Sequence, residues 1–431
     1  MQKIIENSFE NQVKDLQELI RIPSVSRGEP KEGMPYGEHV YTALRKAQEI
    51  AKRLGFEKVW DVEGRCGVVE YGEGEELVAV MAHLDVVPEG TGWTYPPYGA
   101  EIHDGAMDGL GTADDKGAAV SALYALYALK ESGAKMRRRV RILLGCDEER
   151  GSTGMERYRE VEGEPTMAFT PDATYPVVNS EMNISHMMFE KKYPTVIRAK
   201  VGTATNVIPG AAEATIPGED GPTALAVKGK EGHASMPDHA DNALMKLLSA
   251  LSEADLPQAD GETFAGLATL LCGYNHGEGL GVDFTDASGR LTLAPTILTA
   301  SEAGITIGFD CRYPASMTFE ALTGPIDQRL GELGFVVKDR SNSLGHYIAP
   351  DTELVSTLMD VYGELSGDHD AKPLSIGGGT YAREFQNAVA IGVTRPDRPD
   401  LCHIANENIL LSEMLFNTRY MAECLKRLAA E

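Results

Sequence analysis

The hydrophobic pattern of the first 180 residues combines helical and strand-like periods. Apolar side chains recur at a 3.6-residue period in residues 4–20 and 37–56, and residues 118–133 predict a third helix. Short apolar runs predict strands, and these runs are 66–71, 77–82, 138–149 and 165–173. Strands that alternate with helices in this order indicate an α/β layer with largely parallel strands.

The pattern changes after about residue 184. Residues 194–216 and 292–314 are rich in β-branched residues and interrupted by glycines, and they predict strands of a separate α+β unit. The α/β pattern returns near residue 350 and ends with a helix over 409–430. We therefore predict one domain made of residues 1–184 and 349–431, interrupted by an insertion of residues 185–348.

Composition and charge exclude several classes of partner. The 431 residues are 42% hydrophobic and carry a formal net charge of −25, so a folded protein that repels nucleic acid and anionic membranes is expected. The chain contains neither a signal peptide pattern nor an apolar run long enough for a membrane span. Six scattered cysteines without C-x-x-C spacing predict reduced thiols and a cytoplasmic protein.

Acidic and imidazole side chains recur where predicted strands end. Each of them has an ordinary structural interpretation by itself, as a solvated turn residue or a hydrogen-bonded histidine. Ligands of open α/β sheets bind beyond the carboxyl ends of the strands, so we expect these side chains to converge there. They are His83, Asp85, Asp114, Asp115, Glu148, Glu149, Asp172 and, in a late loop, His403.

The spacing of two pairs suggests distinct roles. Side chains two residues apart on a strand share a face, so His83 can bind a metal while Asp85 fixes its orientation or that of a neighbouring group. Successive residues that leave a strand point apart. One of Glu148 and Glu149 can therefore bind metal while the other faces the substrate as a base.

The number of candidate ligands favours two metal ions. His83, His403, Asp114, Glu149 and Asp172 exceed the roughly three protein ligands of a catalytic zinc ion. They suit two ions that each take one histidine and one carboxylate of their own and share Asp114. Such a pair activates a bridging water for hydrolysis. Glu148 would accept the proton of that water and pass it to the leaving amine.

Several motifs resemble the M20 metallopeptidases, and within them the PepV-like dipeptidases of the Xaa-His dipeptidase and carnosinase branch. They are MAHLDVVPEG, GWTYPPYGAEIHDGAMDGLGTADDKG, GCDEERGS, TPDATYPVVNSE and IGGGTYAREFQNAVAIG. They occur in the family's order and span almost the whole chain. The resemblance implies a three-layer αβα catalytic domain with a mixed, largely parallel sheet, interrupted by an inserted α+β lid domain.

The resemblance also implies roles for the site residues. It assigns His83, Asp114 and Asp172 to one ion, and Asp114, Glu149 and His403 to the other. It makes Asp85 a supporting residue and Glu148 the general base, and it implies a cis peptide between Asp114 and Asp115. The expected ions are zinc, with manganese or cobalt as alternatives. The residues given roles by resemblance are His83, Asp85, Asp114, Glu148, Glu149, Asp172 and His403.

Further residues of the inserted unit match lid positions of the family. His233 matches the histidine that stabilises the oxyanion, and Arg312 matches the arginine that binds a substrate carboxylate. Without the resemblance, Arg312 could equally form a surface ion pair with Asp310. Asn206 matches a lid asparagine that contacts the bound peptide. The loop that approaches the ligand is implied to include Gly378, Gly379 and Thr380.

We therefore predict a cytoplasmic, metal-dependent dipeptidase that hydrolyses short unblocked peptides. Alternatives within the same chemistry are an N-acyl-amino-acid deacylase and a carboxypeptidase. A non-catalytic metal or peptide binder is the alternative from another class, and Glu148 argues against it because a binder needs no base. A small peptide is the expected partner, and a monomer is expected, with a homodimer as the alternative.

Overall fold

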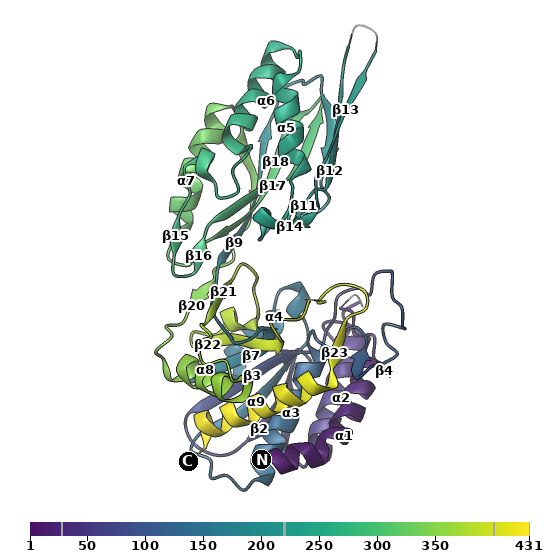
Figure 1. The fold of residues 1–431 in the computed structure, drawn as a ribbon, viewed down its shortest axis with the longest axis vertical. Coiled ribbons are helices and arrows are strands. Elements are labelled where there is room, and N and C mark those ends of the chain that lie inside the picture. The colour runs from purple at the N-terminus through teal and green to yellow at the C-terminus, as the bar shows by residue number, and fades with distance from the viewer. Residues whose placement is uncertain (27–28, 219–220, 400, 431) are drawn as a thin grey trace. The chain divides into compact units, whose positions relative to one another are not determined.

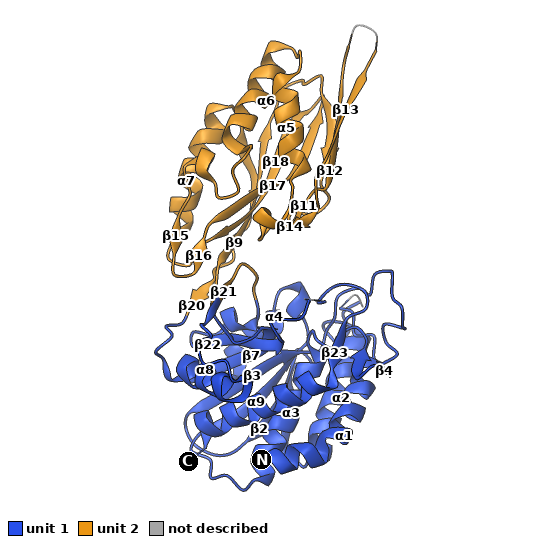
Figure 2. Ribbon diagram, viewed as in Figure 1, with its two compact units in different colours: residues 1–179, 348–374, 380–431 blue, residues 180–347, 375–379 orange. Residues whose placement is uncertain are grey.

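The computed structural model of the protein describes residues 1–26, 29–218, 221–399 and 401–430. The chain forms two compact units (Figure 2). Unit 1 comprises Met1–Asn179, Ile348–Leu374 and Thr380–Glu431, and unit 2 comprises Ser180–Tyr347 and Ser375–Gly379. The segment 375–379, which we had assigned to the first domain, therefore groups with unit 2.

Unit 1 contains a mixed sheet in the order β1-β2-β6-β3-β7-β22-β8 (Figure 1). Strands β6, β3, β7 and β22 are parallel to one another, and β1, β2 and β8 run antiparallel to their neighbours. The strands of the sheet are β1 (Lys58–Val62), β2 (Cys66–Tyr71), β3 (Leu77–His83), β6 (Arg139–Gly145), β7 (Met167–Thr174), β8 (Val177–Glu181) and β22 (Ala388–Thr394).

Helices cover both faces of this sheet. They are α1 (Gln2–Ile20), α2 (Glu38–Arg53), α3 (Lys116–Glu131), α4 (Thr153–Glu162), α8 (Glu353–Ser366) and α9 (Leu411–Ala429), with short 3-10 turns η1 (Glu148–Arg150) and η4 (Tyr381–Glu384). Alternate residues of β3, Val78 and Val80, are buried in one apolar cluster with α1, α2, α3, α8 and α9. Met155 and Tyr158 of α4 are buried outside that cluster, and α4 contacts β1 and β2. The predicted three-layer αβα fold with a largely parallel sheet is confirmed.

Helix α3 is the central helix of this core. Its sequence is apolar on all sides, and a helix of that composition requires burial all round. Nearly all of its residues are buried, because α1 and α9 pack against it on the side away from β3 and β6.

Residues 90–117, which lie between the predicted strand 77–82 and the predicted helix 118–133, contain regular structure. Strands β4 (Glu101–His103) and β5 (Ala106–Asp108) form a hairpin, and β5 also pairs with β23 (Asn408–Leu410). The loop is therefore bound to a segment about 300 positions later in the chain. Local patterns could not indicate that pairing.

Unit 2 contains an antiparallel sheet in the order β13-β12-β10-β17-β18-β9-β19. Helices α5 and α6 pack together, and Phe309 and Ile307 of β18 are buried with Leu247 and Leu267 from these helices. This α+β core contains none of the buried residues of the unit 1 cluster. The elements are α5 (Ala243–Glu253), α6 (Gln258–Leu271), α7 (Phe319–Glu332), η2 (Pro237–His239), η3 (Glu278–Leu280), β9 (Asn183–Lys191), β10 (Arg198–Val201), β11 (Val207–Ile208), β12 (Ala211–Ile216), β13 (Thr223–Lys228), β14 (Gly232–His233), β15 (Thr285–Asp286), β16 (Gly289–Arg290), β17 (Thr292–Ser301), β18 (Gly304–Tyr313), β19 (Val336–Arg340), β20 (His346–Tyr347) and β21 (Leu374–Ile376).

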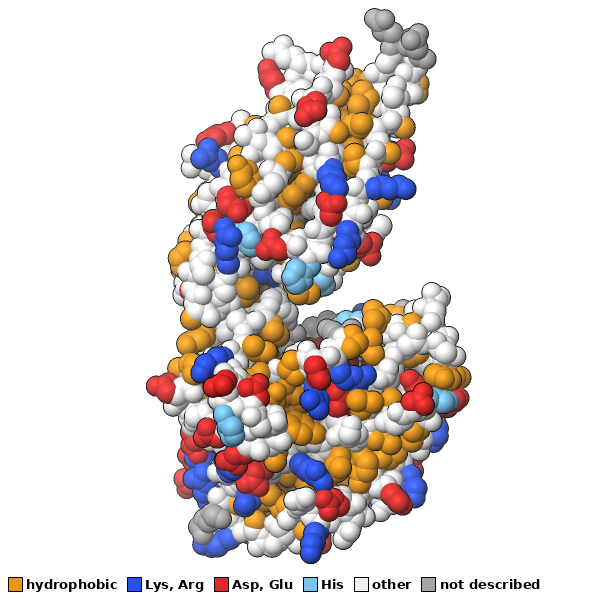
Figure 3. Space-filling view, viewed as in Figure 1, with side chains coloured by type: hydrophobic (Ala, Val, Ile, Leu, Met, Phe, Trp, Pro, Cys, Tyr) orange, Lys and Arg blue, Asp and Glu red, His pale blue; other side chains and the backbone are white. Residues whose placement is uncertain are grey.

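The visible surface of both units carries charges of both signs (Figure 3). Acidic and basic side chains are interspersed over the face of each unit that Figure 3 shows. None of the helices in the described part of the chain has the length and apolar character needed to cross a membrane. The six cysteines are free thiols, and Cys66, Cys146, Cys311 and Cys424 are buried.

Candidate metal centre

Three neighbouring strands of unit 1 bring the predicted site residues to one edge of the sheet. β3 ends at His83, which is level with Gly145 at the end of the parallel strand β6. β7, on the other side of β3, carries Asp172. The other members come from segments that follow β6, precede α3 or precede β23, and they are Glu148, Glu149, Asp114 and His403.

Asp114 lies between the two histidines. Its Oδ1 is 2.8 Å from Nε2 of His83, and its Oδ2 is 2.9 Å from Nε2 of His403. Each imidazole approaches a second carboxylate, because Glu149 Oε2 is 3.2 Å from His403 Nε2 and Asp172 Oδ2 is 4.0 Å from His83 Nε2. One carboxylate therefore touches both histidines, and each histidine has a further acidic neighbour of its own.

Asp85 supports this arrangement through both its backbone and its side chain. Its carbonyl oxygen lies 2.9 Å from His83 Nδ1, and its carboxylate accepts the backbone N–H groups of Glu148 and Glu149, each at 3.2 Å. The carboxylate is 3.6 Å from His83 Nδ1. The side chain of Asp85 thus positions the glutamate pair more directly than the imidazole. Asp115, which we had given no role, accepts the backbone N–H of His83 at 3.0 Å.

The electrostatics are those of crowded, buried acids and imidazoles. Burial raises the pKa of Glu148 to about 8, and the charges of Glu149 and Asp114 add to the effect. Hydrogen bonds to Asp114 and Glu149 raise the pKa of His403 to about 11. Burial disfavours the charged imidazole of His83, yet its hydrogen bonds with Asp114 and Asp85, together with the charges of Asp114 and Asp172, outweigh burial and raise its pKa well above the usual value. Without a cation, protons supply the positive charge that these carboxylates require.

The residues present suit divalent cations. Ligand atoms of His83, Asp114 and Glu149 lie within 4.8 Å of one another, and so do those of His83, Glu148 and Asp172. Glu149 Oε1 is buried and has no hydrogen-bond partner among the residues that the structure describes. Mixed imidazole and carboxylate donors are typical ligands of zinc and its first-row neighbours. An acceptor atom without a donor, in such a cluster, is available to a cation.

The backbone of the ligand segments has two unusual conformations. The peptide between Asp114 and Asp115 is cis, as the resemblance implied. His403 has φ +65°, in the left-handed region that side chains other than glycine rarely adopt. Both conformations belong to residues of the cluster.

Sequence reasoning missed two buried charged residues next to the cluster. Lys116 donates to the carbonyl oxygens of Leu19 and Ile22, at 3.2 and 2.8 Å, and burial lowers its pKa to about 7. Glu407 accepts backbone N–H groups from the segment that carries Asp114. The available signals were that Lys116 directly follows two aspartates and that Glu407 closely follows the candidate ligand His403. Neither signal indicated burial.

In unit 2, Asn206 and His233 lie side by side. β11 pairs with β14, with Val207 opposite His233, and Ala234 donates its backbone N–H to the carbonyl oxygen of Asn206 at 2.9 Å. Nδ1 of His233 is 2.6 Å from the hydroxyl of Ser235. Both predicted residues are exposed. This arrangement orients the imidazole through one nitrogen.

Arg312 forms a buried ion pair instead of the surface pair that we had considered. Its Nε and Nη2 donate to the carboxylate of Asp310, each at 2.8 Å, and its Nη1 donates to the carbonyl oxygen of Gly377 at 2.6 Å. Arg312 is 5% exposed and Asp310 is fully buried. Burial alone would raise the pKa of Asp310, but hydrogen bonds from His186 and Arg312 lower it. The carboxylate of Asp310 therefore stays ionised although it is buried in unit 2.

The predicted ligand-binding loop of Gly378, Gly379 and Thr380 is divided between the two units. Gly378 and Gly379 belong to unit 2, and Thr380 belongs to unit 1. The hydroxyl of Thr380 accepts the backbone N–H of Ala382 at 3.1 Å and so caps η4. A side chain at Gly377 would bring its Cβ to 3.1 Å from that of Ser235, which restricts this position to a small residue. Thr380 thus has a clear structural role.

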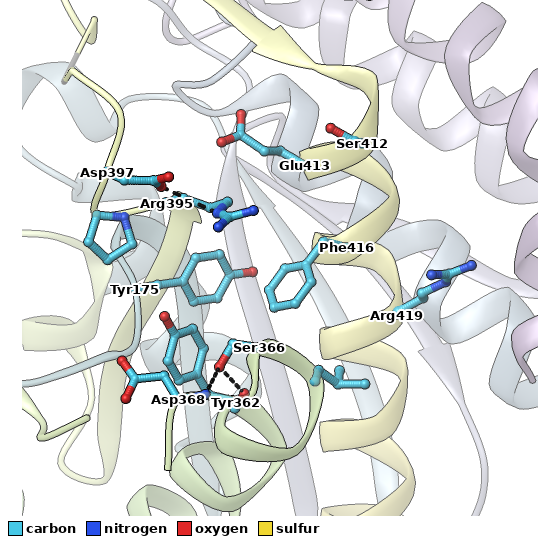
Figure 4. Close-up of a pocket in the computed structure, with 12 residues that line it drawn as sticks. Tyr175, Tyr362, Ser366, Asp368, Arg395, Asp397, Ser412, Glu413, Phe416 and Arg419 are labelled. Atoms are coloured by element: carbon cyan, nitrogen blue, oxygen red, sulfur yellow. Dashed lines mark hydrogen bonds and ion pairs between the residues drawn. The ribbon is translucent and has the colours of Figure 1, made fainter. Parts of the chain in front are cut away.

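Two hollows of unit 1 differ in their relation to the cluster. One, of about 550 Å³, is lined by Glu149 with Val86, Val87 and Pro88 among others, so it opens beside a candidate ligand. The other, of about 420 Å³, lies between α8 and α9, and its lining includes Tyr362 and Arg395 (Figure 4). None of the described residues that line the second hollow is a predicted metal ligand. The first hollow is therefore the one that adjoins the candidate centre.

Comparison with known proteins agrees with this geometry. Residues 79–427 match the family described as Peptidase family M20/M25/M40. The chain is 33% identical to YtjP of Bacillus subtilis (strain 168), over 97% of each chain. It is 30% identical to a Beta-Ala-Xaa dipeptidase of Lactobacillus delbrueckii subsp. lactis, over 97% of this chain and 96% of the relative.

A solved structure shows the same fold. Human carnosine dipeptidase 1 superposes with a TM-score of 0.64 at 14% sequence identity, covering 99% of this chain and 98% of the human chain. The family match covers most of the chain and includes the strands that carry the cluster. The chain belongs to peptidase family M20/M25/M40 and is a metallopeptidase.

Proposed function

We propose that unit 1 is a dimetal catalytic domain and that Asp114 is shared by the two ions. The arrangement that carries the proposal is the carboxylate of Asp114, whose two oxygens each face a different imidazole. His83 and Asp172 complete the protein ligands of one ion, and Glu149 and His403 complete those of the other. Zinc is the ion that we propose, because imidazole and carboxylate ligands suit it.

When bound, the ions supply Lewis acidity that acidifies water and polarises the scissile carbonyl. Glu148 accepts the proton of the attacking water and delivers it to the departing amine. Its backbone N–H is held by Asp85, so its position is set by the same residue that orients His83. Burial beside other acids favours the protonated form of Glu148 after the attack, which suits a group that must next act as an acid.

We propose that unit 2 acts as a lid and contributes substrate-binding groups. Arg312 uses three of its five N–H donors within unit 2, which leaves two for a substrate carboxylate. Asn206 and His233 would contact the peptide and its oxyanion, and Gly378, Gly379 and Thr380 would border the bound peptide. A preference for free dipeptides is supported by the likeness to the Beta-Ala-Xaa dipeptidase.

The direct test of this function uses the full-length protein. Metal is removed with a chelator, single divalent ions are restored, and four substrates are compared: a dipeptide, its N-acetylated form, its C-terminal amide and a tripeptide. We expect restored activity on the free dipeptide and little on the others. Preference for the N-acetylated substrate would instead identify a deacylase, and equal activity on the tripeptide with release of its C-terminal residue would identify a carboxypeptidase.

Metal affinity is expected to rise with pH. The pKa of His403 is raised to about 11 and that of His83 well above normal, so both imidazoles keep their protons at pH 7–8 in the metal-free protein. A cation must displace these protons, and each ion is expected to release about one proton from its histidine. Affinity should therefore increase as pH rises from 6 to 9.

Calorimetry in buffers of different ionisation enthalpy measures the protons released in that titration. The tightness of binding at each pH is measured by competition with a chelator of known pH dependence. A metal affinity that is flat across this range, with no buffer-dependent heat, would contradict the assignment of the two imidazoles as ligands.

Replacing Arg312 by lysine is expected to weaken binding of free dipeptides. Lysine keeps a positive charge beside Asp310 but lacks the planar fork. Because charge-assisted hydrogen bonds contribute about 1.5–3 kcal/mol, KM should rise about 10- to 100-fold for the free dipeptide. The C-terminal amide of the same dipeptide should show little change.

Steady-state kinetics on both substrates separates the carboxylate contact from a general defect. Arg340→Lys is the matched control, because Arg340 also pairs with an aspartate of unit 2, Asp327, and was assigned no substrate role. An equal loss on the amide and the free acid would show that Arg312 supports the fold of unit 2 and does not bind the carboxylate.

Subcellular location and oligomeric state stay predictions. The scattered cysteines predict a cytoplasmic protein, and the resemblance of the large insertion to the enlarged lid of PepV-like dipeptidases implies a monomer, with a homodimer as the alternative. Sedimentation of the purified protein distinguishes the two oligomeric states.

A further inference from the structure

Glu407 is a fully buried carboxylate bonded to the loop that carries Asp114. Its Oε1 accepts three backbone N–H groups, from Gly111 at 3.0 Å, Ala113 at 2.9 Å and Asp114 at 3.1 Å. Three donors on one carboxylate oxygen fix the directions of three peptide groups within four residues. Gly111 has φ +90°, a conformation that glycine adopts readily, so the turn is suited to point its N–H at this oxygen.

The backbone of Glu407 also binds this loop. Its carbonyl oxygen accepts the N–H of Gly109 at 3.0 Å, and the next residue, Asn408, pairs with Asp108 where β23 meets β5. His403 lies four residues before Glu407 in the same segment. One residue therefore connects the loop of Asp114 to the segment of His403 through both its side chain and its main chain.

This connection bears directly on the metal centre. Asp114 approaches His403 at 2.9 Å, and the two residues come from segments almost 300 positions apart. Residues that hydrogen-bond to metal ligands without binding the metal themselves typically contribute about 10- to 100-fold to metal affinity. We propose that Glu407 is a positioning residue that holds Asp114 at the correct distance from His403. This inference rests on the proposed role of both residues as metal ligands.

A different buried glutamate provides a matched control. Glu413 is 3% exposed and lies on α9, in the segment that follows β23. Its Oε2 accepts from Nη1 of Arg398 at 2.6 Å and from the N–H of Leu410 at 3.4 Å, so it stabilises the start of α9. Among the residues that the structure describes, neither of these hydrogen-bond partners of Glu413 lies in the loop 109–114.

The experiment compares Glu407→Gln, Glu407→Asp and Glu407→Ala with Glu413→Gln in the full-length chain. Glutamine keeps a hydrogen-bond-accepting oxygen on a side chain of the same length, and aspartate keeps the charge on a shorter side chain. Alanine removes both the acceptor and the charge. Two properties are measured. Amide hydrogen exchange of residues 109–114 is followed in the chelator-treated protein, and affinities for zinc and for cobalt are measured with the cobalt absorption spectrum.

We expect faster exchange of residues 109–114 and about 10- to 100-fold weaker metal binding in the aspartate and alanine variants. Their cobalt spectra should change, because the geometry of the ligands is altered. Glutamine should resemble the wild type more than alanine does. Glu413→Gln should leave the exchange of this loop, the affinity and the spectrum unchanged, even if it lowers thermal stability.

Two outcomes would overturn the inference. One is wild-type exchange and affinity in Glu407→Asp, a variant that remains informative if Glu407→Ala does not fold. The other is a loss of exchange protection and metal affinity in Glu407→Gln that is as large as in Glu407→Ala. That result would show that the negative charge, and not the hydrogen-bond acceptor, is required. Failure of the proposed function is distinct, because the wild type would then bind no ion. The exchange measurement needs no ion and would still test the connection.

Discussion

Glu148→Gln is expected to lower dipeptide turnover by roughly 10²- to 10⁴-fold, the usual contribution of a general acid–base group. Glutamine has nearly the same shape as glutamate, and the backbone N–H at this position would still be held by Asp85. The variant cannot accept a proton from water or return one to the amine. Metal content should change little, because the proposed ligands are all retained.

The measurement pairs steady-state turnover with metal content determined by elemental analysis. Glu156→Gln is the control, because Glu156 is an exposed residue of the nearby helix α4 with no role in the centre. A variant that turns over at more than a tenth of the wild-type rate would show that another group acts as the base. Loss of an ion together with activity would reassign Glu148 as a ligand.

The central layers of unit 1 were predictable because their signals are local. Each of β3, β6 and β7 is a short, mostly apolar run that ends in or is followed by polar residues, and α3 is apolar over most of its length. Their order predicted parallel strands, and parallel strands place their carboxyl ends at one edge. The gathering of His83 with Asp172 at that edge followed from topology alone. No side-chain detail was needed.

The parts that could not be predicted depend on pairing between distant segments. The hairpin of β4 and β5 is completed by β23, and residues 90–117 by themselves look like an irregular loop. Residues 258–271, which form α6, carry no clear helical signal, because Gly261 and Gly266 weaken the pattern. Packing against α5 stabilises this helix in the structure. In both cases a tertiary contact determines the local structure.

Within the site, the identity of the acidic residues was easier to predict than their hydrogen bonds. Asp85 was expected to orient either His83 or a neighbouring group, and its carboxylate accepts two backbone N–H groups of the neighbouring glutamate pair. The spacing did not indicate which of the two it would be. Glu407 was not singled out at all. Both interactions depend on where backbone N–H groups point in irregular loops, and no periodicity of side chains encodes those directions.

The same reasoning explains the result for Arg312. Two residues apart on β18, Asp310 and Arg312 share a face, so an ion pair was foreseeable. The burial of this ion pair was not foreseeable, because it depends on the pairing of β18 with β17 and β9 and on the contact of Arg312 with Gly377 from a later segment. A charged pair that looks like a surface feature in the sequence thus becomes a rigid internal group.

Asp114→Asn is expected to have the broadest effect on the centre, with metal affinity reduced at least about 100-fold and no measurable turnover. Removal of a metal ligand should lower metal affinity by more than the roughly 10- to 100-fold that is typical when a residue supporting a ligand is replaced. An amide replaces one carboxylate oxygen by a nitrogen that neither binds a cation nor accepts a hydrogen bond from an imidazole. Both proposed ions share this carboxylate, so neither would keep its full set of ligands.

The metal-free form of this variant offers a second, independent result. The hydrogen bond with Asp114 is the largest cause of the raised pKa of His403, which lies near 11 in the wild type. Removing the charge should lower that pKa, so the imidazole should lose its proton at a lower pH, and NMR titration of the chelator-treated protein measures the change. Asp108→Asn is the control, since Asp108 lies in the same loop and pairs instead with His103. Because the titration needs neither metal nor substrate, an unchanged pKa of His403 would show that Asp114 does not pair with this imidazole, whatever happens to activity.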